Sequence, residues 1–182
     1  YNATHRARAT GFDSVTAIGS AGFDNATFIG SAGNDRYVAR PTNAFLRGEG
    51  FLLYAVQFNR VTAKGMGGVD HALLVGSAED NRFFGSKPES YLFGSTFFNS
   101  AEGFRYTSLR FNNDALYIGT FVDSSGNDTL FAKGTKVTLY GDDYLIEAIG
   151  LDVANAKSEN GGIDEAFANL ASFEVNLFGD WN

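Results

Sequence analysis

The side chains best placed to do chemistry are carboxylates and amides that close glycine-rich turns. Residues 18–24, I-G-S-A-G-F-D, return 11 residues later as residues 29–35, I-G-S-A-G-N-D. Related turns occur over residues 76–84 and 123–131. Asn and Asp tolerate left-handed backbone and hydrogen-bond their own main chain, so these segments are typical of sharp corners.

Asp and Asn alternate at equivalent positions of these turns. Asp35, Asn81 and Asp128 occupy one such position. Stacking carboxylates directly on one another would be repulsive, and alternation with Asn lowers that cost. Either a ladder of asparagines or a set of cation sites would explain the pattern.

Groups for acid–base or nucleophilic catalysis are few. His5 and His71 are the only histidines of the chain. Asp70 precedes His71, but neighbours along a strand point to opposite faces of a sheet. We therefore predict no catalytic residue and expect that the chain is not an enzyme.

The elements that carry these turns are short strands. Runs rich in Val, Ile, Phe, Tyr and Thr alternate with Gly, Asn, Asp and Ser, which predicts strands over Ser14–Ile18, 26–29, 36–39, 44–47 and Phe51–Val56. Residues 157–170 favour helix most, but Gly161 and Gly162 interrupt that segment. We interpret it as a decayed copy of an earlier repeat.

The pattern recurs every 46 residues. Phe12, Val15, Thr16, Ala17 and Gly19 return in order as Phe58, Val61, Thr62, Ala63 and Gly65. Four units follow one another, at approximately 12–57, 58–103, 104–150 and 151–182. A fixed period of this size indicates modules that bury their apolar faces by stacking. We predict one all-β domain over residues 1–182, a parallel β-helix (β-solenoid) of about eight coils in which each unit spans two coils.

Stacked coils would fill the interior with columns of like side chains. The predicted columns are Phe12, Phe58, Phe104 and Leu151; Leu46, Leu92 and Leu139; and Phe51, Phe97 and Tyr144. Buried aromatic and leucine columns would account for the 18 phenylalanines without a bound ligand.

Composition restricts the partners. Fourteen basic and 21 acidic residues give a net charge of −7, which disfavours nucleic acid. Without cysteine, neither disulfides nor thiolate metal sites can form, and the apolar runs are too short to span a membrane. Because residue 1 is Tyr, we interpret the chain as a processed protein or a segment of a longer repeat protein.

Residues 30–38, G-S-A-G-N-D-R-Y-V, resemble the nonapeptide of RTX-type calcium-binding β-rolls, G-G-x-G-x-D-x-U-x. In that family, turn carbonyls and aspartates of adjacent coils ligate calcium. The resemblance implies Ca²⁺ as a cofactor, with Asp24, Asp35, Asp80 and Asp128 as its ligands. Turns of Asn, Asp and Gly that bind no ion explain the same residues.

The segments F-D-x-V-T-A at residues 12–17 and G-S-A-G-N-D at residues 30–35 resemble the repeats of long secreted or surface-attached bacterial proteins. This resemblance implies an extracellular, non-enzymatic structural role at the cell surface. The expected protein is a fibre, stalk or adhesin whose copies, or further repeats, stack end to end because solenoid ends expose unpaired strand edges.

The alternative function is a carbohydrate-binding or polysaccharide-cleaving β-helix attached to a larger secreted enzyme. Its partner would be an extracellular polysaccharide, bound by unrepeated aromatics and by cationic side chains. The aromatic candidates are Trp181, Tyr54 and Tyr106, and the cationic candidates are Arg60, Lys64 and Arg82.

Overall fold

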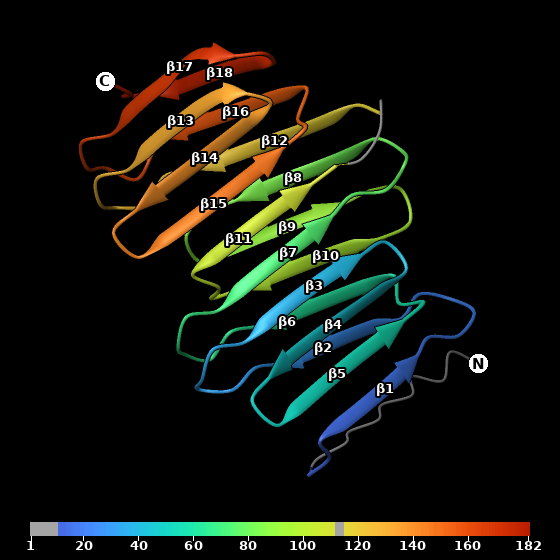
Figure 1. The fold of residues 1–182 in the computed structure, drawn as a ribbon. Coiled ribbons are helices and arrows are strands. Elements are labelled where there is room, and N and C mark those ends of the chain that lie inside the picture. The colour runs from blue at the N-terminus through green and yellow to red at the C-terminus, as the bar shows by residue number, and fades with distance from the viewer. Residues whose placement is uncertain (1–10, 112–114) are drawn as a thin grey trace.

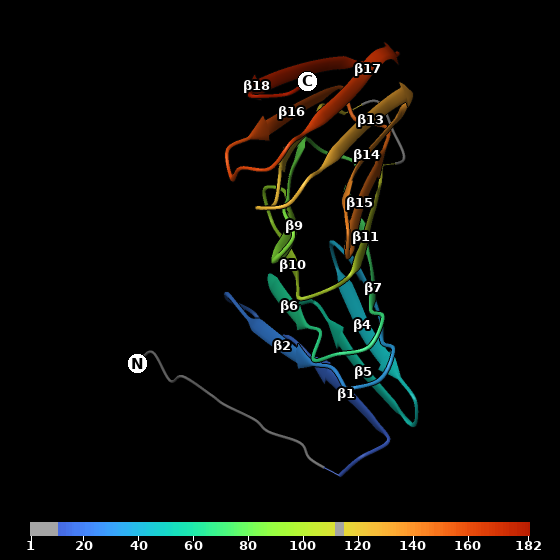
Figure 2. The ribbon, with the colours of Figure 1, turned by 90° about the vertical axis from the view of Figure 1, so that its left-hand side faces the viewer.

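The chain folds into two facing sheets of short strands joined by tight corners (Figure 1). The computed structural model describes residues 11–111 and 115–182, and these contain no helix. The strands form a parallel β-solenoid of about four turns, with one layer on each side of the core (Figure 2). The predicted all-β solenoid is thus confirmed.

The two layers are called sheet A and sheet B. Sheet A contains β1 (Ser14–Ile18), β3 (Arg36–Arg40), β4 (Asn43–Gly48), β5 (Phe51–Val56), β7 (His71–Val75), β11 (Tyr106–Arg110), β13 (Thr129–Gly134), β14 (Lys136–Gly141), β15 (Tyr144–Ile149) and β17 (Glu165–Ala171). Sheet B contains β2 (Asn25–Ile29), β6 (Arg60–Lys64), β8 (Asn81–Gly85), β9 (Glu89–Phe93), β10 (Phe98–Glu102), β12 (Tyr117–Val122), β16 (Val153–Ser158) and β18 (Glu174–Gly179). The orders are β1-β5-β4-β3-β7-β11-β15-β14-β13-β17 in sheet A and β18-β16-β12-β8-β9-β10-β6-β2 in sheet B.

The chain alternates single crossings with antiparallel meanders. From β1 it crosses to β2 and back to β3, then forms the meander β3-β4-β5, which brings β5 beside β1 in parallel. The same path recurs with β8-β9-β10 in sheet B and with β13-β14-β15 in sheet A. Parallel pairs join all other neighbours within each sheet.

The prediction of eight coils, two to each 46-residue unit, is not confirmed. The segment from β3 to β5 stays within one sheet, so it contributes a meander where the sequence indicated a second coil. The chain passes between the sheets only at the connections outside the meanders, such as the steps from Ser14 to Asn25 to Arg36. The solenoid consequently makes about four turns.

Residues that are equivalent in sequence alternate between the two sheets. Leu46 lies on β4 in sheet A, whereas Leu92 lies on β9 in sheet B. Leu46 pairs with Leu53 and Tyr37 of its own meander. The predicted columns of like residues therefore do not form, because an odd number of crossings separates each unit from the next.

The core lies between the sheets and is built from alternate residues of each strand. On β6, Val61 and Ala63 are buried while Arg60 is exposed, the period of two that a strand requires. Most residues of the predicted columns are buried, including Leu46, Leu92, Leu139, Phe97, Phe104, Tyr144 and Leu151. Phe12 is the clear exception, with 64% of its surface exposed beside the open end at β1.

The core is least covered at the two ends of the solenoid. Val15 and Ala17 on β1 are only half-buried, as are Ala166 and Val175 on β17 and β18. Equivalent inward positions near the middle, such as Ala63, are fully buried. At the β17 end, Trp181 packs against the core and pairs with Asp164 as an isolated bridge.

The described residues contain no helix of the length and hydrophobicity needed to cross a bilayer.

Candidate functional site

Each glycine-rich corner is organised by the acidic or amide side chain at its end. Before β3, the backbone N–H of Ser31 donates to Oδ2 of Asp35 at 2.6 Å, and the Ser31 hydroxyl donates to Oδ1 at 3.0 Å. The N–H of Gly33 donates to the Ser31 hydroxyl at 3.1 Å. A Cβ at Gly30 would lie 2.5 Å from Asp35 Oδ2, so a side chain does not fit there. The corner thus satisfies its own backbone donors.

The same arrangement recurs at three other corners. A serine N–H donates to an acidic or amide oxygen four residues later, at 2.6 Å for Ser20 and Asp24, 2.8 Å for Ser77 and Asn81, and 2.6 Å for Ser124 and Asp128. At the Ser77 corner the organising residue is Asn81, whose Nδ2 also donates to the Ser77 hydroxyl at 2.8 Å. An amide therefore substitutes for the carboxylate within this chain.

Successive turns are joined by a second set of side-chain contacts. The N–H of Asp24 donates to Oδ1 of Asn59 at 2.8 Å, and the N–H of Asp35 donates to Oδ1 of Asp70 at 2.7 Å; each pair is 35 residues apart. The N–H of Asp128 likewise donates to Oδ1 of a residue 36 positions later, at 2.9 Å. These bonds join three of the four corners to the turns stacked on them, whereas the N–H of Asn81 donates to the backbone carbonyl of Leu116.

The four predicted calcium ligands lie at separate corners. Asp24 precedes β2 and Asp35 precedes β3, on opposite sheets. Asp80 is exposed, and its carboxylate accepts the N–H of Leu116 at 3.1 Å. Within the described residues, Asp128 is the one member of the four that lies in a group of three close ligands.

That group consists of Asp123, Asp128 and Asp164. All three are buried, and each offers a carboxylate oxygen within 4.8 Å of the other two. Asp128 lies at the corner before β13, Asp164 at the stacked corner before β17, and Asp123 directly follows β12. Asp123 and Asp164 were missed from sequence; the 36-residue offset between Asp128 and Asp164, which differs from the 46-residue period, hides the pairing.

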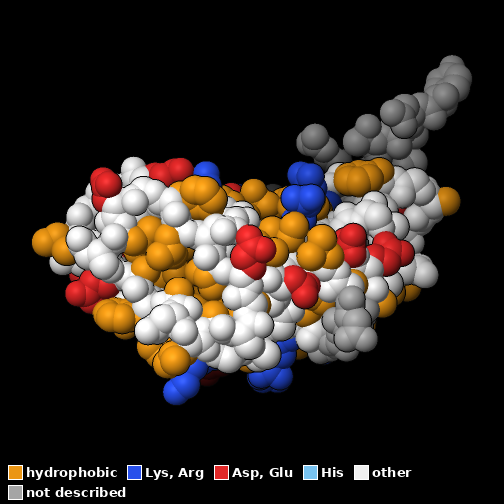
Figure 3. Space-filling view, turned by 90° about the horizontal axis from the view of Figure 1, so that it is seen from above, with side chains coloured by type: hydrophobic (Ala, Val, Ile, Leu, Met, Phe, Trp, Pro, Cys, Tyr) orange, Lys and Arg blue, Asp and Glu red, His pale blue; other side chains and the backbone are white. Residues whose placement is uncertain are grey.

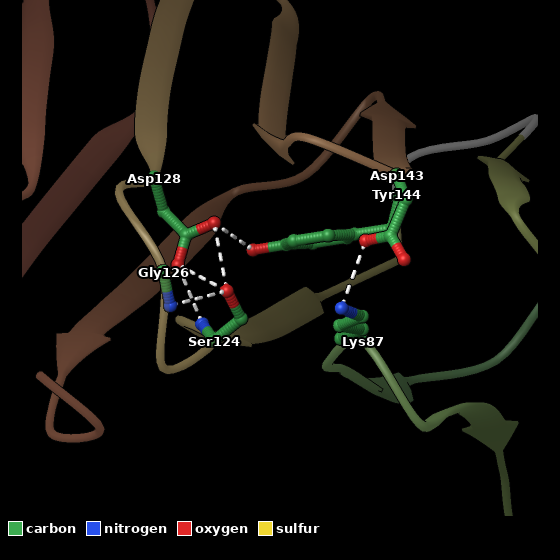
Figure 4. A network of polar contacts seen from close by, with 6 residues as sticks. All are labelled: Lys87, Ser124, Gly126, Asp128, Asp143 and Tyr144. Atoms are coloured by element: carbon green, nitrogen blue, oxygen red, sulfur yellow. Dashed lines mark hydrogen bonds and ion pairs between the residues drawn. The ribbon is translucent and has the colours of Figure 1, made fainter. Parts of the chain in front are cut away.

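Donors of the chain already occupy the carboxylates of this cluster. Figure 4 shows Asp128 accepting the N–H and hydroxyl of Ser124 and the hydroxyl of Tyr144, the last at 2.9 Å. Burial, and then the hydrogen bond to Asp128, raise the pKa of the Tyr144 hydroxyl, so that group remains a donor at neutral pH.

The other two carboxylates are held in the same way. Asp164 accepts the Ser158 hydroxyl at 2.8 Å in addition to the N–H of Asp128. Asp123 accepts the N–H of Glu159 at 3.1 Å and that of Asn160 at 2.9 Å. Carboxylate oxygens are ligands that Ca²⁺ prefers, yet here they close and join the corners through protein donors.

Asp70 is the buried acid at the corner before β7. Burial raises the pKa of its carboxyl, and the nearby Asp35 carboxylate raises that pKa further. The hydrogen bond from the Asp35 N–H and the proximity of His71 lower the pKa, but by less than burial raises it. The His71 ring is exposed on the outer face and lies 4.7 Å from the Tyr106 ring. Asp70 therefore accepts a hydrogen bond inside the corner, whereas the His71 side chain lies on the outer surface.

An ion pair links two exposed loops near Asp128 and Tyr144. Lys87 forms an ion pair of 2.8 Å with Asp143, which joins the β8–β9 turn to the β14–β15 turn (Figure 4). Both side chains are about half exposed, so the pair contributes little to stability.

The residues predicted for carbohydrate binding do not converge on one groove. Lys64 forms a 2.6 Å ion pair with Glu102, and the Arg60 guanidinium lies 4.4 Å from the centre of the Phe98 ring. Arg82 is exposed on the same sheet. The predicted aromatics are dispersed: Tyr54 and Tyr106 lie on β5 and β11 in sheet A, whereas Trp181 lies beside Asp164 at the β17 end.

Comparisons with known proteins return no match: no family model, no curated protein and no solved structure is significantly similar to this chain.

Proposed function

We propose that this protein is a non-enzymatic structural module of the cell exterior, which builds a fibre, stalk or adhesin by stacking end to end. The observation that carries the proposal is that both ends of the solenoid combine edge strands with exposed apolar side chains. The resemblance of residues 12–17 and 30–35 to surface repeats supports the extracellular location. In this proposal the 46-residue unit is the building block, with two single strands and one meander.

Four edge strands terminate the two sheets. Sheet A ends at β1 and β17, and sheet B ends at β2 and β18. Among the described residues, partial cover exists only at the start of β17, where Asn182 accepts the N–H of Ala166 and donates its own N–H to the carbonyl of Asp164. Unpaired edges of this kind are templates for pairing with another chain.

Large apolar side chains gather at the same ends. Those exposed near β1 and β2 are Phe12, Ile18, Phe23 and Ile29, and those exposed near β17 and β18 are Ile163, Phe167, Leu170, Leu177 and Phe178. The space-filling view shows hydrophobic side chains interspersed with acidic ones over one face of the molecule (Figure 3). Apolar surface concentrated at an edge marks an interaction site.

The direction of the edge strands suits a head-to-tail junction. Apart from the central strand of each meander, all strands of a sheet run the same way, so β1 and β17 are parallel, as are β2 and β18. β17 of one copy can then pair with β1 of the next, and β18 with β2. Both sheets would continue across the junction with parallel hydrogen bonding.

Proline on β1 tests this junction. The backbone N–H of Leu52 donates to the carbonyl of Asp13, and the N–H of Gly19 donates to the carbonyl of Val56. Because hydrogen-bonding groups alternate in direction along a strand, the odd-numbered residues of β1 bond to β5. Thr16 therefore directs its N–H toward the free edge. In sedimentation velocity we expect wild-type protein to form large assemblies with rising concentration and Thr16→Pro to remain monomeric.

Thr16→Val keeps the N–H and the strand propensity, and it should assemble like the wild type. A wild-type chain that stays monomeric at high concentration would contradict the proposal. Assembly of Thr16→Pro at the wild-type level would also contradict it, provided circular dichroism shows that the variant is folded.

A further inference from the structure

A concave surface on the outside of sheet A is rich in cations. A cavity of about 690 Å³ lies over β4, β3, β7 and β11, and its lining includes Arg36, Arg47, His71, Ser108 and Arg110. All three arginines and His71 are exposed. This surface lies away from the solenoid ends and is not used by the stacking proposed above.

The arginines are placed without acidic partners. Arg36 and Arg47 are directly opposite each other across the antiparallel pair β3–β4, an arrangement that is unfavourable for like charges. In the part of the chain that the structure describes, all four ion pairs involve lysine and none involves arginine. Asp35 lines the same cavity, but its carboxylate is buried and bonded to Ser31.

This pairing of two arginines occurs in one meander only. The equivalent cross-strand pairs are Arg82 with Phe93 in the β8–β9 hairpin and Thr129 with Tyr140 in the β13–β14 hairpin. Cations that merely kept a repetitive surface solvated would not need to face each other at one place. A site that binds an anion accounts for a like-charged pair that the chain leaves uncompensated.

Two of the arginines and two neighbouring rings form a line along the solenoid axis. Arg47, Arg36, His71 and Tyr106 are successive cross-strand neighbours on β4, β3, β7 and β11. Neighbouring strands are about 4.8 Å apart, so the donors recur at short, regular intervals. A linear ligand with regularly spaced negative groups, lying along the axis, would meet each of them.

We propose that this surface binds an acidic oligosaccharide whose sugars carry carboxylates. Arginine guanidinium groups bind carboxylates through two parallel hydrogen bonds, and Arg36, Arg47 and Arg110 each offer that geometry. The Ser108 hydroxyl and the His71 ring line the cavity and supply the polar and apolar contacts that sugar rings need. The Tyr106 ring lies beside His71, tilted by 30° to it. The volume falls within the range of small-ligand sites.

A titration with oligogalacturonate tests the proposal, using isothermal calorimetry on the full chain at low salt. The double variant Arg36→Gln/Arg47→Gln should raise Kd by about tenfold or more, because it removes charge-assisted hydrogen bonds. Arg82→Gln is the matched control, since Arg82 is equivalent to Arg36 in sequence but lies on sheet B. It should leave Kd unchanged. A neutral dextran oligosaccharide should not bind.

Three results would overturn the proposal: no binding of oligogalacturonate, an equal loss in Arg82→Gln and in the double variant, or equally tight binding of a polyglutamate peptide at the same arginines. The first removes the site, the second reduces it to unspecific charge, and the third assigns it to acidic peptides. Since the substituted arginines are exposed, no loss of thermal stability is expected for any variant.

Discussion

At the scale of single residues, the acidic side chains at the corners act as hydrogen-bond acceptors for backbone N–H groups. Asp35 and Asp128 close their corners by accepting serine N–H groups at 2.6 Å. Asp70 and Asp164 then join those corners to the stacked turn. Buried carboxylates are tolerated because each accepts donors that the turns would otherwise leave unpaired.

Asp128 tests this role. Asp128→Ala leaves the Ser124 N–H and the Tyr144 hydroxyl without an acceptor, and we expect a loss of about 3 kcal/mol in the free energy of unfolding. Asp128→Asn should lose about 1 kcal/mol, because Asn81 holds the equivalent corner with an amide. Urea denaturation measures both. Equal losses for the two variants would show that the charge, and not the acceptor, matters.

Asp70 makes stability depend on pH. Its carboxyl pKa is raised above the ordinary value of 3.8, mainly by burial, so the folded state holds the proton more tightly than the unfolded state. Tighter proton binding stabilises the folded state. This contribution is present in full below pH 3.8 and is lost as pH rises through the raised pKa of Asp70.

Asp70→Asn keeps the oxygen that accepts the Asp35 N–H, as Asn59 does for Asp24. The free energy of unfolding of this variant minus that of the wild type should be larger at pH 7 than at pH 3, as measured by urea denaturation at each pH. Asp142→Asn, at an exposed position, controls for the loss of one negative charge. A difference between Asp70→Asn and wild type that is the same at both pH values would contradict the role given to burial.

At the scale of elements, the two-residue hairpin loops and the longer glycine-rich corners differ in where they lead the chain, although loop length alone does not decide between crossing the core and turning back. Two-residue loops at Pro41–Thr42 and Glu49–Gly50 connect antiparallel neighbours, as short hairpin loops do. Gly50 adopts a positive φ of 76°, which glycine permits without steric cost. The six-residue corners between β1, β2 and β3 lead to the opposite sheet, and so does the two-residue link at residues 172–173 between β17 and β18.

Leu92 measures how much a meander strand contributes. It lies on β9, fully buried, with Phe83 and Asn99 as its partners on the adjacent strands. Leu92→Ala should cost about 2–5 kcal/mol of unfolding free energy through lost burial and a cavity. Phe12→Ala, at a residue 64% exposed, should cost about 0.5 kcal/mol or less. Thermal or urea unfolding that ranks the two variants the other way would contradict the assignment of the core.

Strand positions were predictable, whereas their connection was not. The runs Ser14–Ile18 and Phe51–Val56 coincide with β1 and β5, because β-branched and aromatic residues between glycine-rich turns specify strands locally. The sequence period suggested coils of equal size, but it reports only which residues are equivalent. The short loop at Glu49–Gly50 favoured a hairpin, but the equally short link at residues 172–173 crosses to the other sheet, so loop length was not a sufficient signal. The cluster of Asp123 with Asp128 and Asp164 depends on which turns stack, which no local pattern records.

At the scale of the whole molecule, the described residues form a stack that has an edge strand of each sheet at both ends. Sheet A and sheet B both terminate in edge strands, and inward residues such as Val15 and Val175 are only half covered there. A net charge of −7 opposes unspecific association between copies of the chain through electrostatic repulsion. Growth along one axis follows if the ends pair with each other, because the sides present complete sheets.

Negative-stain electron microscopy of the purified chain over a range of concentrations tests this claim most directly. We expect unbranched filaments one solenoid wide in the wild type and in Thr16→Val, and none in Thr16→Pro. Isolated short rods of the wild type at every concentration would contradict end-to-end stacking.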